Sequence, residues 1–225
     1  MGLVLEYAGS REYSILKGLE RLGVKAAPAP ADSAEVKAVF ITGEFAAASE
    51  ENARLVREVC GRFRALEVPV VFDPDLRGVA PDKYALINEI AALCEIFVPS
   101  DEDAKALCGL DDPEETAKYY LAPGVPKIVI TLDKKGAYYR SAKESGYAPT
   151  FRADRVVDTR GAGKAFAAGL ISGIIEELPL GEAVIRANAC GCISIQREGE
   201  YFPDGAELRE YMLSHRFAVE GCKEY

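Results

Sequence analysis

The sequence lacks the features that would place it in a membrane or on a nucleic acid. Its 225 residues contain no long uninterrupted apolar run and no charged leader before an apolar stretch, so neither a membrane-spanning helix nor a secretory signal is predicted. Acidic residues number 36 against 27 basic ones, and the net charge of -9 disfavours binding to phosphate backbones or anionic membrane surfaces. We therefore expect a soluble, cytoplasmic protein with no nucleic-acid or membrane partner.

Histidine and clustered cysteine are nearly absent as well. His215 is the only histidine, which gives no support to a histidine-based mechanism. Of the six cysteines, only Cys190 and Cys192 lie close together in the sequence, and residues two apart on a helix point to different faces. No cysteine metal site is predicted, and the cysteines are interpreted as small buried core residues.

The sequence does contain a regular alternation of buried strands and helices. Hydrophobic residues make up 49% of the chain, enough for one domain with a substantial core. Strands are predicted at 36–42, 68–73, 96–99 and 127–132, with 136–140 as a hairpin partner, and helices at 49–66, 81–94, 163–178 and 181–196. Ser49 is expected to cap the first helix, and Ser100 with Asp103 fits a capping box. The alternation predicts an α/β fold with a mainly parallel sheet and helices on both faces.

Polar segments follow the predicted strands. They are residues 43–44, 73–77, 100–103, 131–133 and 158–164. Ligands of such sheets bind beyond the carboxyl ends of the strands, so these segments are expected to gather at one edge. The residues expected to line one crevice there are Asp73, Arg77, Ser100, Thr131 and the turn 161–164.

The most informative of these segments is a glycine turn that leads into a helix. Gly161 and Gly163 allow a sharp turn and a close approach of the backbone to a ligand. The following helix begins with free N–H groups and a favourable dipole, which together attract a phosphate or an oxyanion. The turn therefore predicts phosphate chemistry.

Several segments resemble one known family of enzymes. Residues 158–169, which read Asp-Thr-Arg-Gly-Ala-Gly-Lys-Ala-Phe-Ala-Ala-Gly, resemble the C-terminal signature of the ribokinase-like sugar kinases, the phosphofructokinase-B family. Segments 71–77, 98–104, 130–137 and 187–191 with 196–199 resemble the family in the same order. Of these, 98–104 is similar to the form typical of 2-keto-3-deoxygluconate kinases. The resemblance implies a three-layer α/β/α sandwich that binds ATP with Mg²⁺ and a sugar or sugar acid.

The resemblance also implies roles for particular residues. It implies an anion hole at Gly161, Ala162 and Gly163 with Arg160 beside it, nucleotide contacts at Thr131, Asp133, Gly136 and Asn188, substrate contacts at Asp73, Arg77 and Asp158, and a metal contact at Asp103. Other interpretations stay open. Arg77 could form a surface salt bridge, residues 101–103 could only cap a helix, and Asp133 and Asn188 could serve loop structure.

Two departures from the family pattern bear on activity. Where the family carries an aspartate, its general base, directly after the second glycine, this chain has Lys164. A protonated lysine cannot accept the proton of an attacking hydroxyl. The chain also begins after the family's first strand pair, its sugar-binding glycine-glycine-asparagine motif and most of its β lid. In a single domain spanning 1–225, residues 1–30 are then expected to hold a lid remnant, with a weak match at 7–11, and an entry helix.

Lys164 has three interpretations. Together with Arg160 it could hold phosphate oxygens, which would leave binding without turnover. Burial beside Arg160 could instead favour a neutral amine that works as the base. It could also form an ion pair with an acidic neighbour such as Asp158 or Asp73 and plug the site.

The predicted function is a catalytically degenerate carbohydrate-kinase homologue that still binds a nucleotide or another anion. The first alternative is an active ATP-dependent sugar or sugar-acid kinase that uses another base, with Asp158 the first residue to test. The second is a structural or interaction subunit. Without a lid, the strand at 36–42 or the apolar residues 3–5 would be exposed, and a homodimer would cover them.

Overall fold

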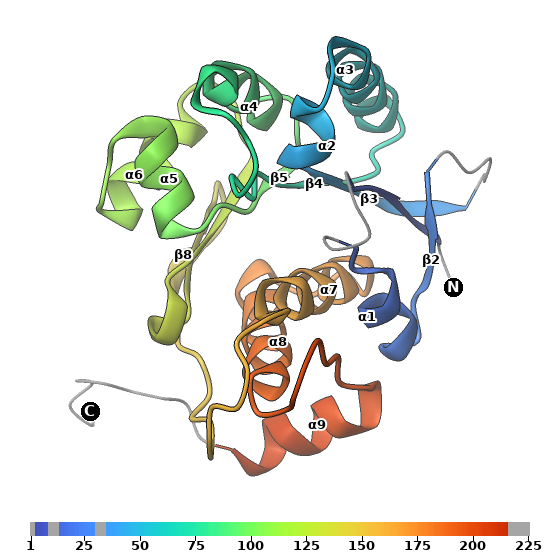
Figure 1. The fold of residues 1–225 in the computed structure, drawn as a ribbon, viewed down its shortest axis with the longest axis vertical. Coiled ribbons are helices and arrows are strands. Elements are labelled where there is room, and N and C mark those ends of the chain that lie inside the picture. Colours follow the sequence, from blue (N-terminus) through green and yellow to red (C-terminus); the bar gives the residue numbers. More distant parts are fainter. Residues whose placement is uncertain (1–2, 9–13, 30–34, 216–225) are drawn as a thin grey trace.

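The computed structural model describes residues 3–8, 14–29 and 35–215, and its centre is an eight-stranded sheet with the order β2-β1-β3-β4-β5-β6-β7-β8 (Figure 1). The strands are β1 (Leu3–Tyr7), β2 (Lys25–Pro28), β3 (Val36–Thr42), β4 (Val70–Asp73), β5 (Ile96–Phe97), β6 (Lys127–Thr131), β7 (Ala137–Ser141) and β8 (Ser145–Ala148). The strands from β2 to β6 pair in parallel, and β7 and β8 continue the sheet as antiparallel strands.

Helices cover both faces of this sheet, which gives three layers (Figure 1). One face carries α2 (Gly43–Ala47), α3 (Glu50–Ala65), α4 (Tyr84–Ala91) with the short 3-10 turn η2 (Pro81–Lys83) before it, α5 (Asp101–Cys108) and α6 (Pro113–Leu121). The other face carries α1 (Leu16–Arg21), α7 (Ala162–Ile175) and α8 (Leu180–Ser194), and α9 (Gly205–Ser214) packs against α8. A second 3-10 turn, η3 (Asp133–Lys135), follows β6. The predicted α/β class and mainly parallel sheet are confirmed.

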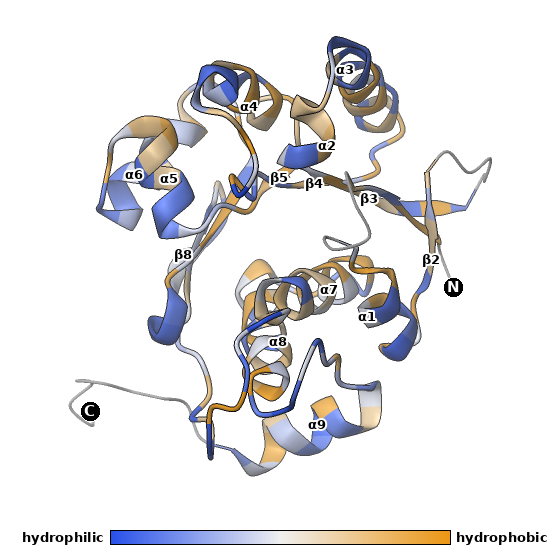
Figure 2. Ribbon diagram, in the orientation of Figure 1, coloured by the Kyte–Doolittle hydropathy of each residue, from blue (hydrophilic) through white to orange (hydrophobic). Residues whose placement is uncertain are grey.

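Side-chain alternation along the strands builds a core on each side of the sheet. In β3, Val39 and Ile41 belong to the core beneath α3 and α4, whereas Ala38 and Phe40 belong to the core against α7. Figure 2 shows apolar residues concentrated along the strands and the helix faces turned toward them. The apolar run of residues 38–41 in β3 follows from burial on both faces.

The helix boundaries follow the predicted caps. The Ser49 hydroxyl accepts a hydrogen bond from the Asn52 amide at the start of α3, and Ser100 with Asp103 forms a complete capping box at the start of α5. The α7 and α8 helices approach each other so closely at Gly169 that a Cβ there would lie 2.8 Å from the Cys190 sulfur. The predicted helix boundaries agree with the structure to within a few residues.

The N-terminal segment, for which a lid remnant and an entry helix are expected, contributes to the main sheet. Its described residues form β1, α1 and β2, and the two strands extend the main sheet in parallel. Tyr7 is a buried residue of β1, and residues 9–11 lie outside the described ranges. A short apolar strand and a four-residue edge strand carry too little periodicity to be distinguished from a lid by sequence.

The expected exposure of the strand at 36–42 is wrong. β3 is an interior strand, paired with β1 on one side and β4 on the other, and Val4 and Leu5 of β1 are buried. The sheet edge next to them is β2, with Lys25 and Pro28 exposed. Any partner that covers an edge on this side would therefore meet β2.

The cysteines are core residues, as expected, within the described ranges. Cys60, Cys94, Cys190 and Cys192 are buried free thiols, and Cys108 is partly buried. His215 ends α9 and stacks on Tyr211, with ring centroids 3.8 Å apart. Among the described residues, none of the helices combines the length and the apolarity needed to cross a membrane.

Candidate functional site

A cleft of about 300 Å³ opens at the carboxyl edge of the parallel strands. The residues expected in one crevice that do line it are Asp73, Arg77, Ser100, Thr131, Gly163 and Lys164. They come from the ends of β4 and β6, the start of α5 and the first turn of α7. The predicted gathering at one edge is confirmed for these six, because parallel strands deliver their carboxyl ends to the same side.

The glycine turn sets the start of α7 at the cleft. Gly161 is its N-cap residue with φ +82°, and a Cβ there would lie 3.2 Å from Cγ of Glu200. A left-handed backbone in that crowded position favours glycine. The first amides of α7 have no partner within the helix, and Gly163 and Lys164 carry two of them into the wall of the cleft.

Asp158 and Arg160 satisfy each other beside the turn. The carboxylate of Asp158 accepts hydrogen bonds from the Arg160 guanidinium at 2.7 Å, the Arg160 amide at 2.9 Å and the Gly199 amide at 3.1 Å. The Arg160 side chain, followed by these amides, holds the pKa of Asp158 well below its ordinary value. Asp158 therefore stays ionised and fastens residue 199 of the loop before α9 to the turn.

Lys164 forms an ion pair with Glu200. The Lys164 side chain is only 12% exposed, whereas that of Glu200 is 49% exposed and comes from the loop that Asp158 fastens. A second carboxylate, that of the buried Glu6 in β1, also interacts electrostatically with Lys164. Burial raises the pKa of Glu6, and the charge of Lys164 opposes that rise. Lys164 therefore forms an ion pair, as one of its interpretations expects, but the partner is Glu200 and not Asp158 or Asp73.

The opposite wall of the cleft is acidic. Asp103 accepts hydrogen bonds from the amides of Leu76 at 3.3 Å and Ser100 at 3.2 Å, and the Asp75 amide donates to Asp73 at 3.1 Å. Burial, followed by the charges of Asp75 and Asp103, raises the pKa of Asp73 to about 8. Asp73 is thus a carboxylic acid that holds its proton near neutral pH.

Arg77 and Asp103 have structural contacts beside the roles that the resemblance implies. The Arg77 guanidinium, 77% exposed, forms a two-bond pair with Asp75 at 2.7 and 2.8 Å, and Asp103 completes the capping box of α5. Across the described part of the chain, no group of three or more histidine, cysteine, aspartate or glutamate side chains is arranged to hold a metal ion. The metal role of Asp103 stays a prediction.

The residues expected at the nucleotide divide in two. Thr131 lies in the cleft. Asp133 and Gly136 lie in and after the η3 turn, where both have positive φ, and a Cβ at Gly136 would lie 2.2 Å from the Ala148 carbonyl oxygen. Asn188 is buried, and its side-chain amide donates to the Ala148 carbonyl at 2.8 Å, which fastens α8 to β8. Gly136 and Asn188 therefore have structural roles, and their contacts with a nucleotide stay predictions.

Glu200 and Glu6 were missed by the sequence reasoning. Glu200 lies 36 residues from Lys164, and Glu6 lies on the far side of the chain's first helix. No spacing rule links such distant positions. The only indication in the sequence is the positive charge of Lys164, because a buried ammonium group needs a carboxylate partner.

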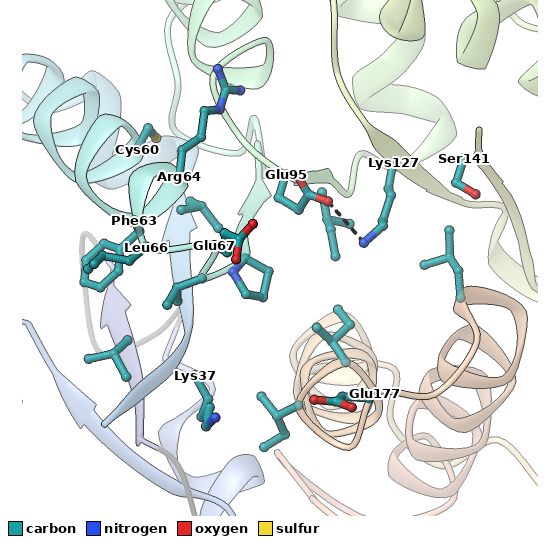
Figure 3. A pocket seen from close by; sticks show the side chains of 18 of the residues that line it. Lys37, Cys60, Phe63, Arg64, Leu66, Glu67, Glu95, Lys127, Ser141 and Glu177 are labelled. Carbon is teal, nitrogen blue, oxygen red and sulfur yellow. Dashed lines mark ion pairs between the residues drawn. The ribbon is translucent and has the colours of Figure 1, made fainter. Parts of the chain in front are cut away.

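A larger cavity of about 1310 Å³ lies at the opposite, amino edge of the sheet (Figure 3). It is lined by the starts of the parallel strands, including Lys37 and Lys127, and by Cys60 and Arg64 of α3. On one wall of the cavity Lys127 pairs with Glu95 at 3.1 Å. None of the predicted site residues lines this cavity.

The fold and the cleft together place a glycine turn and a helix start at the carboxyl ends of a parallel sheet. A family model described as pfkB family carbohydrate kinase matches residues 19–205. The chain belongs to this family, and the predicted resemblance is confirmed.

Individual relatives agree with this assignment. The chain is 37% identical over 180 residues to 2-dehydro-3-deoxygluconokinase of Bacillus subtilis (strain 168), covering 78% of this chain and 55% of that protein. The structure of aminoimidazole riboside kinase from Salmonella enterica, complexed with aminoimidazole riboside and an ATP analog, matches with a TM-score of 0.71 and 27% identity over 79% of this chain and 63% of that one.

A PfkB protein from Polaromonas sp. JS666 has the same fold, with a TM-score of 0.77 and 22% identity over 93% of this chain and 99% of that one. The chain spans about half the length of the curated relatives it matches.

Proposed function

We propose that this chain is a carbohydrate-kinase homologue that binds a nucleotide or another phosphate-bearing anion in the carboxyl-edge cleft without transferring phosphate. The observation that carries the proposal is the ion pair between Lys164 and Glu200 in the first turn of α7. By resemblance, residue 164 stands where the family places its base.

The ion pair opposes general-base catalysis. A base must have a free lone pair within hydrogen-bond reach of the hydroxyl proton. The ammonium group of Lys164 is held by the carboxylate of Glu200 and has no lone pair to offer. Asp158, the first alternative base, is engaged by Arg160 and the Gly199 amide. Neither residue is prepared to accept a proton.

The same wall of the cleft favours a phosphate. The amides at Gly163 and Lys164, the dipole of α7 and the ammonium group of Lys164 all favour negative charge. These residues would hold a terminal phosphate, and Thr131 would contact the same ligand from the end of β6. ATP with Mg²⁺ fits this division of charge, because the carboxylates of Asp75 and Asp103 lie on the opposite wall of the cleft.

The relatives suggest which molecules to test. Because the chain resembles 2-dehydro-3-deoxygluconokinase and aminoimidazole riboside kinase, sugar acids and ribosides are the first candidates for a second ligand. Arg77, at the rim of the cleft, would contact a carboxylate only after exchanging its pairing with Asp75.

An active kinase that uses Asp73 as its base is the second candidate. Asp73 lies in the same cleft, and its pKa of about 8 suits a residue that exchanges protons close to neutral pH. This candidate predicts phosphotransfer that rises with pH through about 8 and disappears in Asp73→Asn. Our proposal predicts no transfer at any pH.

A homodimer is the assembly we propose for testing alongside these functions. Its contact would be the exposed edge strand β2. Light scattering at rising concentration checks this point: a strict monomer would contradict it.

Calorimetric titration with ATP, ADP and inorganic phosphate, each with and without Mg²⁺, tests the proposed function. We expect saturable binding of at least one nucleotide, weakened in Lys164→Ala. Absence of binding by all three ligands would refute the proposal and favour a purely structural role.

A further inference from the structure

Two cysteines that are far apart in the sequence touch in the core. Cys60 lies in α3, and Cys94 lies in the turn between α4 and β5. Their sulfur atoms are 3.7 Å apart, and the two residues are 1% and 0% exposed. A disulfide has an S–S distance of about 2 Å, so the two sulfur atoms must move closer together before they can bond.

Two arginines fix α3 against the segment that carries Cys94. Arg57, one turn before Cys60, forms a two-bond pair with Glu89 of α4 at 2.7 and 2.9 Å. Arg64, one turn after Cys60, donates to the carbonyl of Leu93 at 3.1 Å. Cys60 is therefore held between two cross-links that both reach the α4 region, and its sulfur is kept facing Cys94.

The two thiols have different environments. The hydrogen bond from Cys94 and the charge of Arg64 lower the pKa of Cys60 against the opposing effect of burial, whereas burial raises the pKa of Cys94. Cys60 also borders the large cavity at the amino edge of the sheet (Figure 3). Cys60 thus lines the cavity that small solutes can enter, whereas Cys94 is not among its lining residues.

We propose that Cys60 and Cys94 form a reversible oxidation site that converts a small peroxide to water and closes a disulfide between α3 and the start of β5. The Cys60 thiolate attacks one peroxide oxygen and breaks the O–O bond, which gives a sulfenic acid on Cys60 and, after protonation, one water. The Cys94 sulfur then attacks the Cys60 sulfur. The S–S bond forms, the S–O bond breaks, and the hydroxyl leaves with the Cys94 proton as a second water.

The electron balance closes with the peroxide as sole oxidant. The two sulfurs together lose two electrons, and the two peroxide oxygens gain them. A dithiol reductant reverses the reaction by thiol–disulfide exchange and restores both thiols. The product links helix α3 to the turn before strand β5 and encloses residues 61–93, which restricts the unfolded chain and stabilises the fold.

The test treats the purified full chain with hydrogen peroxide, alkylates the remaining free thiols, and maps the peptides by mass spectrometry without reduction. We expect a linked pair of peptides that contain Cys60 and Cys94, with the loss of two hydrogens, and its disappearance after dithiothreitol. Thermal unfolding of the oxidised chain should shift upward by roughly 5 to 10 °C.

Internal and matched controls identify the pair. Cys190, which is buried with its pKa raised to about 12 by burial, should stay reduced. In Cys94→Ser, Cys60 should reach higher oxidation states and no linked peptide should form. Cys108→Ser should leave the linkage intact; Cys108 is partly buried, and its thiol donates a hydrogen bond to the Ala104 carbonyl. The mapping of the unmodified chain needs no variant to fold. The proposal would be overturned if Cys60 and Cys94 were still free thiols after peroxide had oxidised Cys108. It would also be overturned if Cys60 were linked to any other cysteine.

Discussion

The ion pair between Lys164 and Glu200 predicts opposite effects on anion binding when either partner is neutralised. Lys164→Ala removes a largely buried ammonium group, whose side chain is 12% exposed, from the wall of the cleft. A hydrogen bond to a charged group contributes about 1.5–3 kcal/mol. The dissociation constant for ADP should therefore rise by roughly ten- to a hundredfold.

Glu200→Gln should have a smaller effect of opposite sign. In the free protein the Glu200 carboxylate occupies the amine that a phosphate would use, so a bound anion has to compete with it. The Glu200 side chain is 49% exposed, and pairs so screened by solvent contribute at most about 1 kcal/mol. Removing the competitor should strengthen ADP binding by up to about fivefold.

Calorimetric titration of ADP at fixed ionic strength measures both changes. Lys37→Ala and Glu67→Gln, at the opposite edge of the sheet, make the same changes in net charge and should leave the affinity unaltered. In the Lys164→Ala background, Glu200→Gln should have less effect than in the unmodified chain. Weaker binding in Glu200→Gln, or unchanged binding in Lys164→Ala, would refute the reasoning.

Three further predictions concern stability. The raised pKa of Asp73, about 8 against an unfolded value near 3.8, means that the folded protein keeps a proton that the unfolded chain loses, so stability falls as pH rises from about 4 to about 8; Asp73→Asn should flatten this fall in Tm, and an unchanged pH profile would contradict it. Gly136→Ala places a Cβ 2.2 Å from the Ala148 oxygen at φ +93° and should lower the unfolding free energy in urea by about 3 kcal/mol, against about 1 kcal/mol for Gly78→Ala, where φ is +83° but the space is open; equal losses would remove the steric argument. Asn188→Ala loses the donor to the Ala148 carbonyl and should cost about 1–3 kcal/mol of stability while leaving ADP affinity within about twofold; a selective loss of affinity would make Asn188 a ligand contact instead.

Local signals in the sequence were sufficient for most of the fold. The Ser49 cap, the Ser100 and Asp103 capping box and the apolar run at 38–41 act within a few residues, so their outcome does not depend on distant parts of the chain. The N-terminal strands were harder. β2 has only four residues, half-exposed along its length, and its place at the sheet edge depends on pairing with β1 rather than on its own pattern.

The candidate site was predictable in position but not in its contacts. The end of each parallel strand is fixed by the topology, which is why Asp73 and Thr131 meet in one cleft. Lys164 enters the same cleft from the first turn of α7. The partner of Lys164 depends on how the loop after α8 folds back onto the glycine turn, through Asp158 and the Gly199 amide. Such long-range loop placement has no signature in one sequence.

The most direct test of the central claim is a phosphotransfer assay on a sample that has first been shown to bind nucleotide. Mg²⁺-ATP is incubated with the unmodified chain and a panel of sugars, sugar acids and ribosides, and phosphorylated product is followed by mass spectrometry. Because Lys164 is held in its ion pair with Glu200, we predict no product above the protein-free rate while nucleotide binding persists. Sustained ATP-dependent formation of a sugar phosphate, lost in Lys164→Ala or in Asp73→Asn, would contradict the account and identify the base.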